Sequence, residues 1–182
     1  RPAFLARLDN TVYDSLVRLA GTTPPAGRIV IADVDERSLA ELGQWPWRRD
    51  RMGQIVSRLR DLGAASVALD VVFAEPDRYQ PSADAGARAD VPSGPPGPDA
   101  AFADALRPGK VILGYAMTFE GSPAANCVLH PVGLALVESG EGNRSPFFQA
   151  AGAICNLPTL ARAAGASGFL NASPDADGIL RR

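Results

Sequence analysis

The 182-residue sequence has few of the residues on which enzyme chemistry usually depends. It contains one histidine, His130, one lysine, Lys110, and two cysteines. His130 precedes Pro131 in a predicted loop, and the sequence offers no second histidine for a metal site or a catalytic triad. The G-x-S-x-G and H-E-x-x-H signatures are also missing, and no glycine-rich segment has the spacing of a phosphate-binding loop. The chain therefore has no recognisable catalytic motif.

Long hydrophobic runs and an excess of positive charge are missing as well. No apolar run approaches the roughly 20 residues that a membrane-spanning helix needs, and no signal peptide is visible. Because the chain begins with Arg1 rather than methionine, we expect it to be a fragment of a longer protein, from which neighbouring membrane segments could have been removed. The formal net charge of −2 provides no basic surface for nucleic acid, so we expect no nucleic-acid partner.

The composition is that of a globular protein, with 46% hydrophobic and 21% charged residues. The length suits one domain over residues 1–182. One segment differs, because residues 80–98 consist mainly of Pro, Gly, Ala, Ser and Asp. Such a composition cannot bury enough apolar surface to order itself, and it predicts a flexible surface loop.

Hydrophobic spacing predicts the secondary structure. Residues 3–20 have apolar side chains every three or four positions, which indicates a long amphipathic helix ended by Gly21. Residues 29–34 and 67–73 are almost continuously apolar, as strands buried on both faces are, and a helix over 50–62 lies between them. Strand, helix and strand in this order predict a right-handed βαβ unit.

A second helix and strand follow, and the strand covers residues 111–117. Near the end, Asp175, Asp177 and Gly178 predict a tight turn into Ile179 and Leu180, consistent with a terminal hairpin. We therefore expect an α/β fold, with a mostly parallel central sheet, helices on both faces, a long N-terminal helix and a C-terminal hairpin.

Acidic residues follow the first two predicted strands. They are Asp33, Asp35, Asp70, Glu75 and Asp77. Parallel strands end at one edge of the sheet, where open α/β sheets bind ligands, so these carboxylates could hold a divalent cation, an amine or a sugar. The alternative is structural and is favoured: Asp35 caps the helix over 38–42, Asp70 pairs with a buried Arg48 or Arg49, and the others are solvated.

Both tryptophans, Trp45 and Trp47, flank Pro46, which disfavours a helical conformation at Trp45. We expect one tryptophan to pack this segment against the sheet. The other could form the aromatic wall of a ligand pocket, and the sequence leaves that role open.

The two cysteines, Cys127 and Cys155, have two interpretations. In a reducing compartment they are small buried hydrophobic residues. In an oxidising compartment they could form a bridge across a loop of roughly 30 residues, worth about 3–4 kcal/mol in the chain-entropy model. The residues alone favour free thiols.

Taken together, the motifs resemble the second family of CHASE domains, which are extracellular sensory domains associated with cyclases and histidine kinases. The resemblance covers nearly the whole chain apart from the 80–98 loop and residues 119–150. It is carried by Tyr13-Asp14, the run from Ile29 to Glu36 with Ser38-Leu39, Gly43-x-Trp45-Pro46-Trp47-x-Arg49, Leu62-Gly63-Ala64, Leu69-Asp70-Val71-Val72-Phe73-x-Glu75-Pro76-Asp77, Gly168-Phe169-x-Asn171 and Asp175-x-Asp177-Gly178-Ile179-x-Arg181-Arg182.

The resemblance implies a periplasmic input domain of a bacterial transmembrane signalling protein. Such a domain would have one membrane helix before it and typically three after it, and it would control a cytoplasmic cyclase, kinase or phosphatase. It implies a homodimer, a small-molecule or protein stimulus of unknown identity, no catalysis by this segment and no cofactor. An oxidising location also gives a Cys127–Cys155 bridge equal weight with free thiols.

Two other functions remain open from the residues. One is a metal-dependent hydrolase that uses Asp33, Asp35 and Asp70, although no lysine or histidine accompanies them. The other is a purely structural or dimerising domain without a small ligand.

Overall fold

The computed structural model describes residues 3–22, 24, 27–79, 96–120, 127–131, 150–172, 174–175 and 177–180. The chain divides into two compact units, Arg1–Gly43 and Gln44–Arg182. Most of the predicted flexible loop, from residue 80 to residue 95, lies outside the described residues. A single domain over the whole chain stays a prediction.

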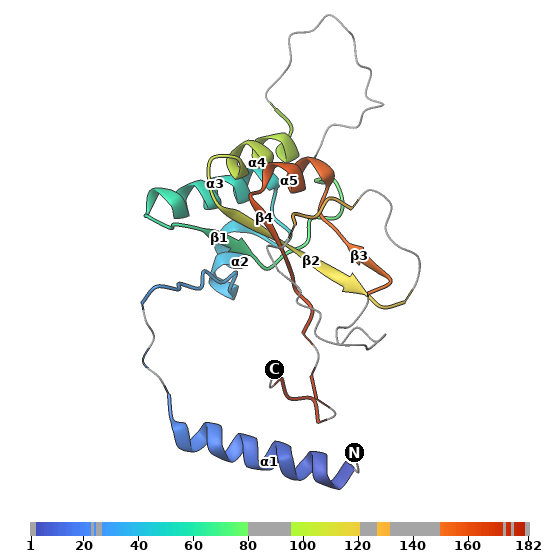
Figure 1. Ribbon diagram of the computed structural model, residues 1–182. Helices are drawn as coiled ribbons and strands as arrows, with labels where there is room; N and C mark the ends of the chain where they lie inside the picture. The colour runs from blue at the N-terminus through green and yellow to red at the C-terminus, as the bar shows by residue number, and fades with distance from the viewer. Residues whose placement is uncertain are drawn as a thin grey trace, which may run out of the picture. The chain divides into compact units, whose positions relative to one another are not determined.

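The first unit contains two helices, α1 (Ala3–Ala20) and α2 (Glu36–Leu42) (Figure 1). Helix α1 covers the range that its hydrophobic spacing predicts. Helix α2 begins after Asp35, whose carboxylate accepts a hydrogen bond from the Ser38 amide at 2.8 Å. It ends at Gly43, whose φ of +88° strains any residue with a side chain. The predicted cap and the predicted end of this helix are both confirmed.

The strand predicted over residues 29–34 is wrong, and so is the βαβ unit built on it. These residues form no regular secondary structure, and Ile29, Val30 and Ile31 are 85–88% exposed. An apolar run becomes a buried strand only where a neighbouring strand pairs with its backbone and other elements cover its faces. The described part of the first unit contains no other strand, so it supplies no such neighbour.

The second unit is built on a four-stranded sheet whose central strand is β2 (Val111–Thr118). The first part of β2 pairs in parallel with β1 (Val67–Leu69) and with β4 (Ala166–Phe169). Its last residues pair antiparallel with β3 (Gly152–Ile154). The α/β fold class with a mostly parallel sheet is therefore confirmed, although β1 ends four residues earlier than predicted.

Three helices complete the second unit: α3 (Arg49–Asp61), α4 (Pro98–Leu106) and α5 (Pro158–Ala163). They lie together on one face of the sheet (Figure 1), whereas the sequence led us to expect helices on both faces. Helices α3 and α4 approach closely at Gly53. A Cβ atom added to this glycine would lie only 3.0 Å from the Cβ of Ala105.

The core lies between this helical layer and the sheet. The rings of Phe73 and Phe102 meet edge to face at 5.1 Å. The largest fully buried side chains are Phe73, Phe102, Leu106, Leu113, Leu160, Val56 and Val111. They come from all three helices, from β2 and from the segment after β1, so one hydrophobic core joins these elements.

The predicted C-terminal turn is present. The Gly178 amide donates to the Asp175 carbonyl at 2.8 Å, and the Asp175 amide donates to the Ile179 carbonyl at 3.0 Å. The described residues on either side of the turn are not strands, so the structure contains the turn of the expected hairpin without its paired arms.

Two asparagines extend the hydrogen bonding of β2. The buried Asn156 accepts from the Phe73 amide and donates to the Gly114 carbonyl, both at 2.8 Å. On the β4 side, the exposed Asn171 accepts from the Met117 amide at 2.6 Å and donates to the Met117 carbonyl at 2.9 Å. Asn156 thus links β2 to the segment that follows β1, where no strand pairing joins them.

We expect Asn156→Ala to lower the free energy of unfolding by roughly 2–4 kcal/mol, because it leaves two backbone groups without partners at a buried position. Asn171→Ala serves as the control and should cost less than about 1 kcal/mol, since water can reach the exposed Met117 groups. Urea unfolding of the two variants measures both values. Equal losses would contradict the role given to Asn156.

Candidate functional site

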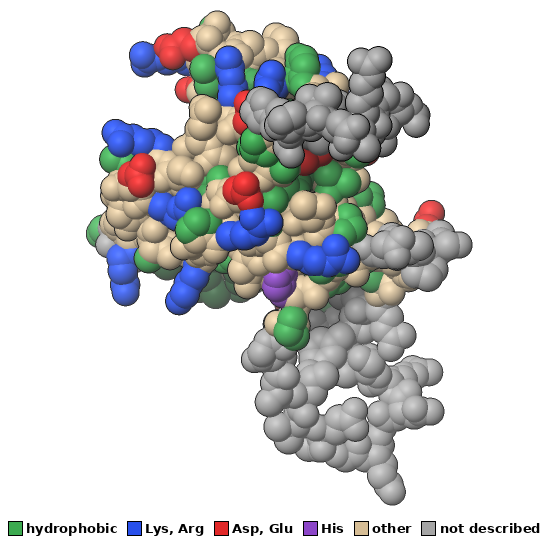
Figure 2. Space-filling view, turned by 90° about the horizontal axis from the view of Figure 1, so that it is seen from above, with side chains coloured by type: hydrophobic (Ala, Val, Ile, Leu, Met, Phe, Trp, Pro, Cys, Tyr) green, Lys and Arg blue, Asp and Glu red, His purple; other side chains and the backbone are tan. Residues whose placement is uncertain are grey.

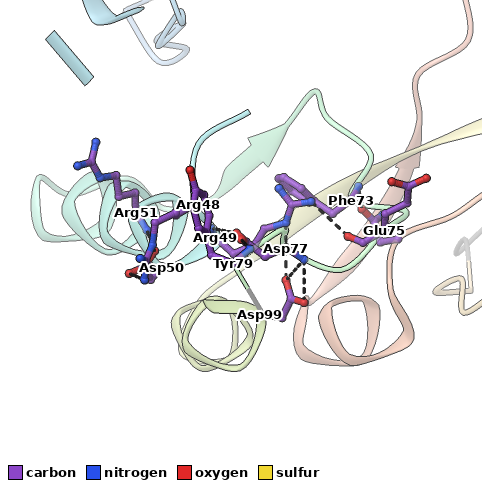
Figure 3. Close-up of polar contacts among 10 residues, drawn as sticks. Arg48, Arg49, Asp50, Arg51, Phe73, Glu75, Asp77, Tyr79 and Asp99 are labelled. Atoms are coloured by element: carbon purple, nitrogen blue, oxygen red, sulfur yellow. Dashed lines mark hydrogen bonds and ion pairs between the residues drawn. The ribbon is translucent and has the colours of Figure 1, made fainter. Parts of the chain in front are cut away.

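A buried polar cluster lies where the chain leaves β1 in the second unit (Figure 3). It consists of Arg49 at the start of α3, Asp77 in the segment after β1 and Asp99 in the first turn of α4. Asp77 is 6% exposed and Asp99 is 9% exposed, so both carboxylates have left water almost completely. We refer to these three residues as the Arg49–Asp77–Asp99 cluster.

Asp77 caps α3 from a distance of 28 residues in the sequence. Its carboxylate accepts from the Arg49 amide at 2.6 Å and from the Tyr79 amide at 2.7 Å. The residue that precedes the helix, Arg48, provides no side-chain cap. A carboxylate at this position satisfies a free amide of the first turn and interacts favourably with the helix dipole. The amide of Asp77 donates in turn to the Asp99 carboxylate, at 3.1 and 3.3 Å to its two oxygens.

The Arg49 side chain provides the balancing positive charge. Its Nε lies 3.8 Å from an oxygen of Asp99, and its Nη2 donates to the Glu75 carbonyl at 3.4 Å. The guanidinium also stacks 4.4 Å above the centre of the Phe73 ring. Burial lowers the pKa of Arg49, and the carboxylates of Asp99 and Asp77 act in the opposite direction. Arginine nevertheless stays protonated at physiological pH, so the cluster contains a buried ion pair.

A second, more exposed set of contacts surrounds this cluster. Arg48 donates to both oxygens of Asp50, at 3.0 and 3.1 Å, and this pair raises the pKa of Arg48 and lowers that of Asp50. Arg78 donates to the Pro46 carbonyl at 2.9 Å. Both guanidiniums lie over the ring of Tyr79, at 5.4 and 5.2 Å from its centre. These contacts fix the Trp-Pro-Trp segment beside the start of α3.

Trp47 is 6% exposed and is part of the core of the second unit. Its ring meets that of Trp45 edge to face at 5.6 Å. Trp45 is half-buried, so part of the residue is exposed. Trp47 therefore has the packing role expected for one tryptophan, and a ligand-binding role for Trp45 stays a prediction.

The predicted acidic residues of the first unit are not part of this cluster. Asp33 is exposed. The carboxylate of Asp35 is engaged by its own helix, because it also accepts from the Ser38 hydroxyl at 2.6 Å, and this bond is the main reason that its pKa is lowered. The convergence of both residues with the acidic residues after β1 depended on the strand over 29–34, which does not form.

Asp70 and Glu75, in the second unit, are exposed. The suggested pairing of Asp70 with Arg48 or Arg49 is wrong, since these arginines pair with Asp50 and Asp99. Of the acidic residues that the sequence singled out, only Asp77 brings its carboxylate into the cluster, while Glu75 contributes its backbone carbonyl. Asp99, in the first turn of α4, was not among the acidic residues that the sequence singled out.

The cluster does not have the composition of a metal site. No group of three or more His, Cys, Asp or Glu residues suited to a metal ion occurs in the described part of the chain. Where a cation would meet the buried carboxylates, the guanidinium of Arg49 is already present. The arrangement joins α3, the segment after β1 and α4 electrostatically.

The two cysteines form a disulfide, with 5.6 Å between their Cα atoms. Cys155 immediately precedes Asn156, and Cys127 begins the described segment 127–131. In that segment, Nδ1 of His130 lies 2.8 Å from the Ser167 hydroxyl on β4. The disulfide and this contact hold the segment against the sheet. The only histidine of the sequence therefore contacts a serine hydroxyl, and it belongs to no group of three or more His, Cys, Asp or Glu residues suited to a metal ion in the described part of the chain.

The sequence was also compared with known proteins. The family model described as the CHASE2 domain matches residues 1–182, which agrees with the resemblance identified from the motifs. No curated protein and no solved structure shows significant similarity to the chain. Within the described ranges, no helix combines the length and the apolar character that crossing a membrane requires.

We expect Asp77→Ala to lower the free energy of unfolding by roughly 2–4 kcal/mol, because the part-buried amides of Arg49 and Tyr79 lose their acceptor and Arg49 loses a nearby charge. Asp77→Asn keeps an acceptor for the helix and should cost less. Glu75→Ala is the control for acidic residues in the same segment and should stay within about 0.5 kcal/mol of the unmodified chain. An Asp77→Ala variant as stable as Glu75→Ala would show that the cap is not important.

Proposed function

The chain belongs to the CHASE2 family of extracellular sensory domains found in signalling proteins, and we propose that it is the periplasmic input domain of a bacterial transmembrane receptor. In this proposal, membrane helices on either side of the domain relay a stimulus to a cytoplasmic cyclase, kinase or phosphatase. The observation that carries the proposal is the match of the family model over all 182 residues. The domain itself performs no catalysis in this scheme.

The disulfide supports an extracytoplasmic location. Disulfides form and persist in oxidising compartments such as the periplasm and are rare in the reducing cytoplasm. The Cys127–Cys155 bridge is thus a feature that a periplasmic domain would be expected to have.

Helix α1 supports the proposed homodimer and the relay. Its large apolar side chains are 47–83% exposed within the first unit. They are Phe4, Leu5, Leu8, Val12, Tyr13, Leu16, Val17 and Leu19. In the proposal, the stripe at Leu5, Leu8, Val12, Leu16 and Leu19 packs against the same helix of a second copy, and a change in this packing reaches the membrane.

The metal-dependent hydrolase has less support. Its three carboxylates, Asp33, Asp35 and Asp70, are exposed, and Asp35 is engaged as a helix cap. A purely structural or dimerising domain differs from a sensor only in its effect on output, so measurements on the complete receptor distinguish the two.

The location is tested by fusing a reporter protein to the parent protein directly after Arg182. Each fusion keeps the whole of the parent protein that precedes this point. We expect alkaline phosphatase to be active and green fluorescent protein to be dark, because the enzyme needs disulfides that form only outside the cytoplasm. The paired fusions control for expression. Inactive phosphatase together with bright fluorescence would contradict the periplasmic location.

A further inference from the structure

A hollow of about 220 Å³ lies on the helical layer of the second unit, where α4 and α5 pack against each other. Arg107, Thr159, Arg162 and Ala163 line it. Arg107 follows the last residue of α4, Thr159 lies in the first turn of α5, and Arg162 lies in its last turn. We propose that this hollow binds a small oxyanion such as a phosphate group. The proposal does not depend on the sensory function.

The lining provides suitable donors for such an anion. Two of the four lining residues are arginines and one is a threonine, and none of the four has a carboxylate. The planar guanidinium matches the spacing of two phosphate oxygens and binds them through parallel hydrogen bonds. Arg162 is exposed and forms no ion pair with the residues that the structure describes, so its charge is available to a ligand.

Arg107 can also serve the anion. It pairs with Asp104, one turn earlier on α4, and both side chains are about 60% exposed. Exposed pairs of this kind contribute little to stability, so a better acceptor in the hollow can compete with Asp104 for the guanidinium. It follows that removing the Asp104 charge should strengthen anion binding.

The helix dipole alone does not account for this arrangement. Arginines in the last turn of a helix are stabilised by the partial negative charge of its C-terminus, and Arg58 on α3 occupies such a position. Arg58 does not line the hollow. The dipole therefore explains individual arginines in the last turns of α3 and α5, but it does not explain why arginines from α5 and from the end of α4 border one concave site.

The size of the hollow and the surface around it restrict the ligand. Sites for drug-sized ligands and cofactors are usually 300–1,000 Å³, so 220 Å³ suits a small anion better than a nucleotide. Figure 2 shows Lys and Arg side chains scattered among apolar and polar ones rather than gathered in one large basic patch. This distribution favours a discrete site over broad attraction to an acidic surface. The phosphate could be free or part of a lipid headgroup.

Thermal unfolding of the chain in inorganic phosphate tests the site, with sodium chloride at the same ionic strength as reference. We expect the melting temperature to rise in a saturable manner with phosphate only. Arg162→Gln should weaken the apparent affinity roughly tenfold or more, because one of two guanidiniums is lost. Arg58→Gln is the matched control and should leave the response unchanged, while Asp104→Asn should strengthen it.

Circular dichroism without phosphate establishes that all three variants are folded. A response to phosphate no larger than that to chloride would overturn the proposal, and so would equal losses in Arg162→Gln and Arg58→Gln. Sedimentation with vesicles that contain phosphatidic acid, against phosphatidylcholine alone, identifies the source. If the chain binds phosphatidic acid and Arg162→Gln abolishes this binding, the ligand is a lipid phosphate. If inorganic phosphate raises the melting temperature and the chain does not bind the vesicles, the ligand is a free anion.

Discussion

The carboxylate of Asp77 is the group on which the second unit most depends. It caps α3 through the Arg49 amide, and its own backbone binds Asp99 on α4. Two buried carboxylates would repel each other, and the guanidinium of Arg49 between Phe73 and Asp99 offsets that cost. Removing the Arg49 charge would leave the two buried carboxylates without a counter-charge. The start of α3, the exit of β1 and the start of α4 therefore have to form together.

Local sequence patterns were sufficient for elements whose stability is local. The spacing in α1, the cap and the C-terminal glycine of α2, and the turn at Asp175 all depend on residues within a few positions of one another. Residues 29–34 show the limit of such patterns. Their composition is that of a buried strand, but a strand also needs a neighbour, and no short segment of sequence specifies that neighbour. The early end of β1 has a similar origin, because a side chain, Asn156, binds the Phe73 amide.

The expected site was the group of acidic residues that follow the first two predicted strands, and the structure preserves only part of it. Asp77 could be singled out because it follows an apolar run closely. Its partners could not, since Arg49 lies 28 residues before it and Asp99 lies 22 residues after it. Pairings over such distances depend on how the helices pack over the sheet. The family was easier to recognise than the site, because its motifs are spread along the whole chain while each contact involves only two or three residues.

We expect the cap on α3 to be as stable as the fold itself, whereas the cap on α2 is local. Native-state amide exchange measured by NMR tests this directly at two equivalent helix starts. The Arg49 amide, bound to buried Asp77, should exchange with an opening free energy close to that of global unfolding. The Ser38 amide, bound to exposed Asp35, should exchange much faster through local fraying. Exchange of the Arg49 amide as fast as that of Ser38 would contradict the central role of the Arg49–Asp77–Asp99 cluster.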